Sequence, residues 1–400
     1  MAMKIEACYI VKNEAANLPR SLASLGDACD TLLVVDTGST DDTVAIARAA
    51  GARVLSYTWQ DDFAAARNYA LAQATGDWLI FLDADEWFVH PLVRAELEAI
   101  LTAPLTRENT RIVNNAAVLA GHGEIAAEPS LPQVADGVLV SMENLEDLQG
   151  NFFSEAHGFL RLMRRDPHLR YRGRIHEQLT YIGQPPRPLC LYDEPPALRL
   201  RHCGYAGTLS PEKSRRNLRL LQAEIAAHGM QPGYDYYLAD CYQGLGDYAA
   251  AARHAAACIR GPVAMVGDGV HPYHVLLECL RQLGGREQEM LTWAGRGIAA
   301  FPQQPEFYAE RGMTLCALGR LREARQDLIE ALIRYEQGGP RPEGGYFYAQ
   351  QAGHCAARLG EIMQLLGDAE EAATWYGLAG RYAPQDDAVQ AKIRRWRDKV

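Results

Sequence analysis

Strand-like segments alternate with helix-like segments through the first 205 residues of this 400-residue chain. The strand-like segments are residues 5–11, 32–35, 53–56 and 77–82, of which residues 5–11 are apolar and β-rich, and the helix-like segments are residues 18–25, 43–50 and 63–74. Because a β-α-β-α order packs helices on both faces of a parallel sheet, the sequence predicts an α/β domain with a mostly parallel sheet. Ligands of such sheets bind at the carboxyl edge of the strands, so the residues that follow each strand are the first candidates for a functional site.

Beyond residue 235 the pattern changes to helices throughout, rich in Ala, Leu and Tyr. Four glycine-containing turns recur there, and their aligned glycines are Gly246, Gly285, Gly319 and Gly367, with spacings of 39, 34 and 48 residues. A helix-turn-helix unit of about 34 residues is the tetratricopeptide period, so an all-α tetratricopeptide-like solenoid is predicted over residues 235–400. A loop insertion at residues 338–345 explains the longest spacing, and residues 206–234 are expected to form a helical linker. An ordinary helical bundle is the alternative.

The composition narrows the classes of function. With 40 Lys+Arg against 50 Asp+Glu the formal net charge is −10, which argues against a nucleic-acid-binding protein, whose surface is basic. No apolar run reaches the roughly 18 residues of a membrane span, and the N-terminus lacks the features of a signal peptide, so a cytoplasmic protein is expected. The nine cysteines are scattered and odd in number, so reduced, mostly buried thiols are expected rather than disulfides or a zinc site.

Two carboxylates, Asp83 and Asp85, follow the apolar segment 78–82 with one residue between them. Alternate residues of an extended segment point the same way, so both side chains can face one ligand. Two such anions repel each other unless a cation lies between them, and Mg²⁺ or Mn²⁺ held by carboxylates and phosphate oxygens meets this need. Because Asp-x-Asp is also common in solvated turns, the motif alone leaves both interpretations open.

A third carboxylate, Asp36, follows the strand-like segment 32–35. Gly38 permits a tight turn after it, and Ser39 or Thr40 can cap the next helix. A capped strand-to-helix turn explains residues 39–43 well. It does not require an aspartate at position 36, so Asp36 is a candidate ligand-binding residue.

Four segments occur in an order that is typical of a known enzyme family. They are residues 10–15 (IVKNEA), 34–41 (VVDTGSTD), 63–68 (FAAARN) and 83–85 (DAD). Over about residues 4–205 the chain thus resembles the family 2 inverting glycosyltransferases with the type A fold, a Rossmann-like, mostly parallel sheet. The resemblance implies a catalytic domain at residues 1–205 that takes a sugar from a nucleotide-sugar donor.

The resemblance also implies which residues hold the donor. Val11, Lys12 and Glu14 would line the nucleoside pocket. Asp36 would accept a hydrogen bond from the base, and Arg67 would lie beside the base or the diphosphate. A UDP-linked sugar is the expected donor.

A divalent metal, Mn²⁺ or Mg²⁺, is the cofactor that the resemblance implies. Asp83 would contact the ribose or metal-bound water, Asp85 would bind the metal, and Ala84 between them is counted among the donor-binding residues. Many type A transferases complete the metal site with a histidine from a late segment, and His202 fits this role by its order along the chain. His176 is the substitute, and a purely structural histidine is the alternative.

Glu177 is the candidate general base, because it lies about where this family places an acidic one. Inverting transfer needs a carboxylate that takes a proton from the acceptor as the acceptor attacks the anomeric carbon. The alternative for Glu177 is an ion pair with one of the six arginines between Arg161 and Arg174. The sequence His176-Glu177 lacks the second histidine of a zinc protease, which argues against that class.

A glycosyltransferase domain followed by tetratricopeptide-like repeats resembles a bacterial subgroup that includes peptide and protein glycosyltransferases acting on cysteine, serine or threonine. A peptide or protein acceptor is therefore expected, held on the concave face of the solenoid. A saccharide or lipid-linked acceptor, with the repeats forming a homodimer, is the first alternative. A nucleotidyltransferase is more remote, because the N-terminus lacks a glycine- and arginine-rich loop. A non-catalytic scaffold is disfavoured by the intact Asp36, Asp83 and Asp85.

Overall fold

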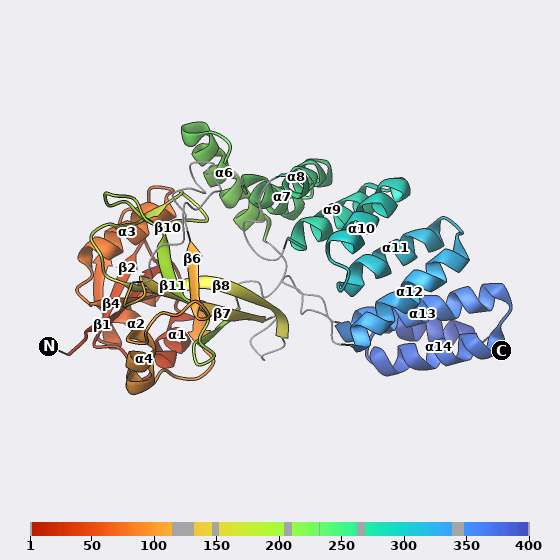
Figure 1. The fold of residues 1–400 in the computed structure, drawn as a ribbon, viewed down its shortest axis with the longest axis horizontal. Coiled ribbons are helices and arrows are strands. Elements are labelled where there is room, and N and C mark those ends of the chain that lie inside the picture. Colours follow the sequence, from red (N-terminus) through yellow and green to blue (C-terminus); the bar gives the residue numbers. More distant parts are fainter. Residues whose placement is uncertain are drawn as a thin grey trace. The chain divides into compact units, whose positions relative to one another are not determined.

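The computed structural model describes residues 2–113, 132–145, 152–203, 210–231, 233–261, 269–337 and 348–398. The chain divides into two compact units, residues 1–234 and 235–400 (Figure 1). The first unit is built on a sheet, and the second is helical. The predicted insertion at residues 338–345 and the predicted boundary after residue 205 lie outside the described residues.

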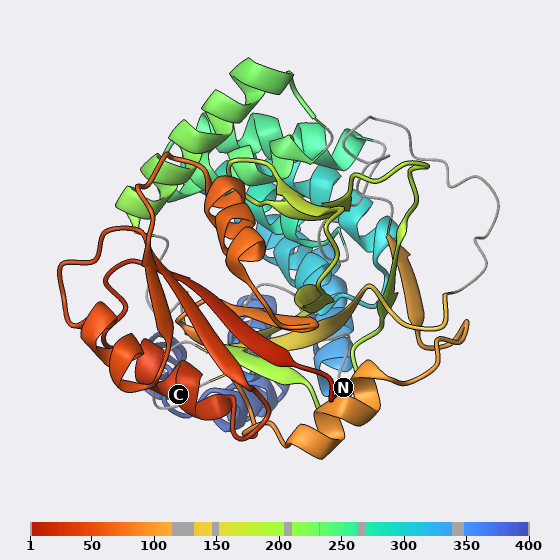
Figure 2. The same ribbon diagram turned by 90° about the vertical axis from the view of Figure 1, so that its left-hand side faces the viewer.

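Parallel strands form the first half of the sheet, in the order β3-β2-β1-β4 (Figure 2). These strands are β1 (Ile5–Val11), β2 (Thr31–Asp36), β3 (Arg53–Ser56) and β4 (Trp78–Leu82), and the helices between them are α1 (Leu18–Ser24), α2 (Thr43–Ala49) and α3 (Phe63–Gln73). Along β1, Ala7 and Tyr9 enter one apolar cluster with α1 and α2, whereas Cys8 enters another with α3. Helices therefore cover both faces of this part of the sheet, as the alternating sequence pattern predicts.

The second half of the sheet is mixed, and it brings late segments of the chain to the end of β4. Strand β4 pairs antiparallel with β8 (Phe152–Arg164), and the order continues with β7 (Gly137–Leu145), β11 (Leu189–Tyr192) and β6 (Thr110–Val113). Strand β12 (Arg199–His202) pairs with β7 and, antiparallel, with β5 (Glu86–Phe88). This unit also contains α4 (Arg94–Leu101) and the separate hairpin of β9 (Leu169–Arg172) and β10 (Gln178–Tyr181). Because His202 lies opposite Glu86, the end of β12 comes beside segment 83–85.

The second unit consists of successive helix pairs. The pairs are α7 (Tyr234–Gly244) with α8 (Tyr248–Arg260), α9 (His271–Leu283) with α10 (Glu287–Ala300), α11 (Pro305–Ala317) with α12 (Leu321–Glu336), and α13 (Tyr348–Leu366) with α14 (Ala369–Tyr382), and α15 (Asp387–Arg397) follows. Each predicted glycine turn lies between the two helices of a pair, and the aligned glycines have φ between 64° and 85°, where a Cβ is unfavourable. The predicted tetratricopeptide-like arrangement is confirmed.

Two glycines of α10 have opposite surroundings, and they test the packing of this unit. A Cβ at Gly297 would lie 2.8 Å from the ring of Phe307 on α11, whereas a Cβ at Gly295 would meet nothing within 4 Å. Both Gly→Ala changes gain about 1 kcal/mol of helix propensity, but overpacking at Gly297 costs about 1–3 kcal/mol. We expect Gly297→Ala to be less stable than Gly295→Ala by this second amount, measured as the free energy of unfolding in urea. Equal stabilities would contradict the close contact of α10 with α11.

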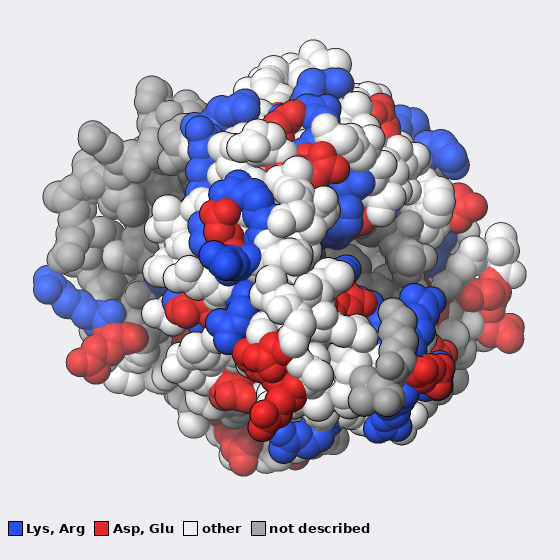
Figure 3. All heavy atoms as spheres, turned by 90° about the vertical axis from the view of Figure 1, so that its right-hand side faces the viewer, with Lys and Arg blue, Asp and Glu red and all other residues white. Residues whose placement is uncertain are grey.

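The cysteines, the apolar helices and the surface charges complete the description. All nine cysteines lie in the described part of the chain as free thiols, and six of them are buried. Within the described ranges, no helix combines the length and the apolar character needed to cross a membrane. Figure 3 shows basic and acidic side chains interspersed on one face of the molecule. Exposed ion pairs between near neighbours in sequence, such as Arg286 with Glu289, contribute little to stability because water and salt screen them.

Candidate active site

The carboxyl ends of β1, β2 and β4 lie next to one another at one edge of the sheet. In the parallel register Val11 pairs with Asp36, and Tyr9 pairs with Leu82, the residue before Asp83. Both Val11 and Asp36 are buried. The structure therefore brings the residues after three strands, which were predicted to bind the nucleoside and the metal, to the same edge.

The loops after β1 and β2 are tied together by hydrogen bonds. Ser39 Oγ accepts from the N–H of Asn13 at 2.9 Å, and Asp36 Oδ1 accepts from the N–H of Ser39 at 3.0 Å. The prediction that a residue of 39–40 caps the next helix is wrong, because the N-cap of α2 is Asp42, which makes no side-chain cap hydrogen bond. The serine hydroxyl joins the two loops instead, which fixes the walls of the site relative to each other.

The two ionisable residues after β1 differ in their surroundings. Lys12 is exposed, whereas Glu14 is half-buried. The N–H of Glu14 donates to Thr43 Oγ1 at 2.7 Å, and its carboxylate accepts from Asn17 Nδ2 at 2.9 Å. Burial raises the pKa of Glu14, and the nearby charge of Asp85 raises it further. Glu14 thus adds a carboxylate to an edge that already holds Asp85.

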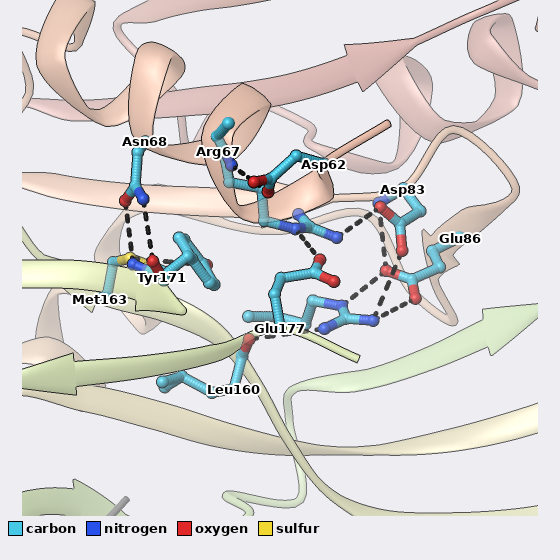
Figure 4. Close-up of polar contacts among 11 residues, drawn as sticks. Asp62, Arg67, Asn68, Asp83, Glu86, Leu160, Met163, Tyr171 and Glu177 are labelled. Atoms are coloured by element: carbon cyan, nitrogen blue, oxygen red, sulfur yellow. Dashed lines mark hydrogen bonds and ion pairs between the residues drawn. The ribbon is translucent and has the colours of Figure 1, made fainter. Parts of the chain in front are cut away.

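Asp83 is held by two arginines. Arg67, on α3, donates from Nη2 to Asp83 Oδ1 at 2.9 Å (Figure 4). Arg161, on β8, has its Nη2 3.7 Å from Asp83 Oδ2. Partial burial acts to raise the pKa of Asp83, but the two positive charges outweigh it, and the pKa lies below its usual value. The guanidinium carbon of Arg67 lies 5.7 and 5.5 Å from the ring centroids of Phe81 and Tyr171, which helps to fix the arginine in place.

Arg67 also binds the candidate base. Its Nε donates to Glu177 Oε1 at 2.5 Å, across 110 residues of sequence (Figure 4), and the side chains of Arg67 and Glu177 are 10% and 11% exposed. The loop that leads into Glu177 is held by helix α6 (Pro211–His228), where Glu224 Oε2 accepts from the N–H of Arg174 at 3.1 Å. The ion pair of Glu177 is thus with Arg67, outside the arginine-rich stretch 161–174, and it links Glu177 to Asp83.

Glu86 and Arg161 belong to this cluster, although sequence reasoning did not assign Glu86 a role. Glu86 is 2% exposed, and its Oε2 accepts from the N–H of Asp83 at 3.2 Å. Arg161 donates to both oxygens of Glu86, from Nε at 2.7 Å and from Nη2 at 2.5 Å. Burial raises the pKa of Glu86, and the charge of Arg161 only partly counteracts this. A glutamate directly after the Asp-Ala-Asp motif and an arginine within an apolar strand are the sequence signals that could have identified the pair.

Asp85 faces His202, the histidine that is expected to complete the metal site. Asp85 Oδ2 lies 3.4 Å from His202 Nε2, and the N–H of Cys203 donates to the Asp85 carbonyl at 3.2 Å. His202 Nδ1 lies 2.9 Å from Asn144 Oδ1, which assigns the proton to Nδ1 and directs Nε2 at Asp85. Burial acts to lower the pKa of His202, but the hydrogen bond and charge of Asp85 outweigh it and raise the pKa. Ala84, the residue before Asp85, is also buried.

The Asp85 carboxylate and His202 Nε2 fit a divalent cation. The two groups are both acceptors and lie 3.4 Å apart, so a proton or a metal ion between them makes the contact favourable. Within the described ranges, no three His, Cys, Asp or Glu side chains are grouped to hold a metal ion. Further ligands would therefore be phosphate oxygens and water, which is the usual composition of Mg²⁺ sites on phosphates. Asp83 contacts arginines instead, and His176 is exposed in the loop between β9 and β10.

Comparison with known proteins gives similarities that each cover part of the chain. Residues 7–105 match the family model described as glycosyl transferase family 2. The chain is 42% identical over 83 residues to an uncharacterized glycosyltransferase of Rickettsia felis, which covers 21% of this chain and 29% of that protein. It is 24% identical over 233 residues to the SPbeta prophage-derived glycosyltransferase SunS of Bacillus subtilis, with 57% and 46% covered. It is also 58% identical over 83 residues to a TPR repeat-containing protein of Synechococcus elongatus, with 21% of each covered.

Some residues of the candidate site lie within the segment that matches the family model, and others lie beyond it. The matched part of each of these curated relatives is less than half of its length. The segment that matches the family model contains Asp36, Arg67 and the two aspartates at positions 83 and 85. Glu177 and His202 lie beyond it, and only the fold brings them to the same place.

Proposed function

Because the chain carries a glycosyl transferase family 2 domain followed by tetratricopeptide-like repeats, we propose that it is a metal-dependent inverting glycosyltransferase that uses a nucleotide-sugar donor. The observation that carries the proposal is the pair of Asp85 and His202, whose carboxylate and imidazole lie 3.4 Å apart near the carboxyl end of β4. In sheets of this type, that edge is where ligands bind.

The donor side of the proposed site is formed by the ends of β1, β2 and β4. Asp85 and His202 would hold Mn²⁺ or Mg²⁺. A bound cation would neutralise the charge that develops on the departing diphosphate. Asp36 and residues 11–14 would contact the nucleoside, for which we propose uridine.

The acceptor side is formed by Glu177. In the proposed reaction its carboxylate takes the proton of the acceptor hydroxyl or thiol, while the acceptor attacks the anomeric carbon and the bond from that carbon to the diphosphate oxygen breaks. The hydrogen bond from Arg67 Nε to Glu177 Oε1, which is 2.5 Å long, orients this carboxylate. The acceptor we propose is a side chain of a peptide or protein, a choice supported by the repeats, because stacked helix pairs offer extended binding surfaces. A saccharide or lipid-linked acceptor is the alternative.

Donor binding tests the proposal directly. With Mn²⁺ present and UDP at about 100 times its Kd, the free energy of unfolding should rise by about 2.7 kcal/mol, which a thermal-shift assay detects as a higher Tm. The shift should shrink when EDTA removes the metal, and UMP, which lacks the β-phosphate, is the matched ligand control. A panel of nucleotide sugars then identifies the donor by slow release of nucleoside diphosphate without acceptor. The proposal is wrong if none of the nucleoside diphosphates and nucleotide sugars, tested with Mn²⁺, raises the Tm.

A further inference from the structure

The buried carboxylate of Glu86 is not used by the proposed reaction. A carboxylate that is 2% exposed is costly unless its charge and its acceptor positions are satisfied. Arg161 satisfies both oxygens with a two-pronged contact at 2.7 and 2.5 Å. An apolar pair of similar volume is often as stable as a buried ion pair. Stability alone therefore does not explain why this site is ionic.

The same contacts fix the turn that carries Asp85. The N–H of Glu86 donates to the Asp83 carbonyl at 3.0 Å, while the Glu86 carboxylate accepts from the Asp83 N–H at 3.2 Å. Positions 83 and 86 are thus joined twice, and Asp85 lies between them. Figure 4 shows Glu86 and Asp83 side by side in this arrangement. Strand β5, which begins at Glu86, is in turn paired with β12, which ends at His202.

We infer that Glu86 and Arg161 are positioning residues, whose two-pronged contact orients segment 83–85 so that Asp85 and His202 can bind one metal ion. The inference rests on the proposed function, since it names what that metal site depends on. The inference depends on the two N–H donors of the Arg161 guanidinium, each of which binds one oxygen of Glu86. A lysine at position 161 would keep the positive charge but, as a point charge, would not match both carboxylate oxygens.

Arg161→Lys tests the inference, and Arg187→Lys is its matched control. Asp136 is also 2% exposed, and Arg187 donates to its two oxygens at 2.6 and 2.8 Å. This second pair lies beside the amino end of β4, away from segment 83–85. We expect the Kd for Mn²⁺, measured by electron paramagnetic resonance with UDP present, to rise about 10- to 100-fold in Arg161→Lys. It should be unchanged in Arg187→Lys, in which the loss of Tm should be smaller, because the side chain of Arg187 is 35% exposed against 16% for Arg161.

A double variant separates positioning from stability. Glu86→Leu combined with Arg161→Met replaces the ion pair by an apolar pair, which should preserve the fold. Positioning predicts a folded protein, by circular dichroism, that binds Mn²⁺ as weakly as Arg161→Lys does. Wild-type affinity for Mn²⁺ in either variant overturns the inference. Glu86→Gln keeps one oxygen as an acceptor but loses the second oxygen that Arg161 binds, so it should give an intermediate Kd for Mn²⁺.

Failure of the proposed function would be seen in the wild-type protein. Mn²⁺ binding that weakens in Arg161→Lys, without release of nucleoside diphosphate from any donor, would contradict the transferase and support the positioning role. A wild-type protein that binds no Mn²⁺ in the presence of UDP would overturn both.

Discussion

Replacement of Asp85 by asparagine should slow sugar transfer by about 10³-fold. The substitution keeps the shape of the side chain but removes the negative charge that faces His202 at 3.4 Å. If the bound cation contributes about 4 kcal/mol to transition-state stabilisation, kcat should fall by about 10³-fold. Two measurements check this result, the release of nucleoside diphosphate from the donor and Mn²⁺-dependent binding of UDP in a calorimeter. Both should be lost together, because they depend on the same metal ion.

Asp77→Asn is the matched control for this experiment, because Asp77 lies at the other end of the same strand. Its Oδ2 accepts from the N–H of Lys4 at 2.8 Å, and an asparagine oxygen can accept the same hydrogen bond. This variant should therefore keep wild-type activity and wild-type metal dependence. Full turnover in Asp85→Asn would remove the metal site from the proposed function.

Replacement of Glu177 by glutamine should slow transfer by about 10²- to 10⁴-fold and leave donor binding nearly unchanged. A glutamine oxygen can still accept from Arg67, so the contacts around Asp83 should persist. The neutral amide, however, cannot take the proton of the acceptor. The expected result is a low kcat for transfer with an unaltered Kd for UDP, which separates a catalytic defect from a binding defect.

Glu143→Gln is the matched control for Glu177→Gln, because it also removes the charge of a carboxylate that pairs with arginine. Glu143 is 15% exposed, close to the 11% of Glu177, and is bound by Arg199 at 2.6 Å and Arg201 at 3.0 Å. On β7 it points to the opposite face from Asn144, the partner of His202. Transfer should stay near the wild-type rate in this control. Wild-type turnover in Glu177→Gln would assign the base to another residue.

Local sequence patterns were sufficient for the first half of the sheet and for the repeats. Residues 5–11 and 53–56 form β1 and β3 with the predicted limits, and the Asp-Ala-Asp motif follows β4 directly. These features depend on short apolar segments and on glycine turns, which act over a few neighbouring positions. The register between distant strands has no such local signal.

Charge pairs that join distant parts of the chain could not be predicted in this way. Arg161 reaches Glu86 across 75 residues because β8 pairs antiparallel with β4, and that strand order is visible only in the fold. The sequence suggests an arginine of residues 161–174 as the ion-pair partner of Glu177, but the partner is Arg67 on α3. Ser39 is a related case, since the local pattern indicated a helix cap while the hydroxyl binds the loop after β1.

Helix α6 sets the length of the smallest fragment that could work as an enzyme. A fragment cut at residue 105, where the match to the family model ends, would retain Asp83 and Asp85 but lack Arg161, Glu177 and His202. Extension to the end of β12 would restore those three side chains, yet the loop before Glu177 would still lack its anchor on α6. Truncation experiments on this protein should therefore keep the chain through His228, the last residue of α6.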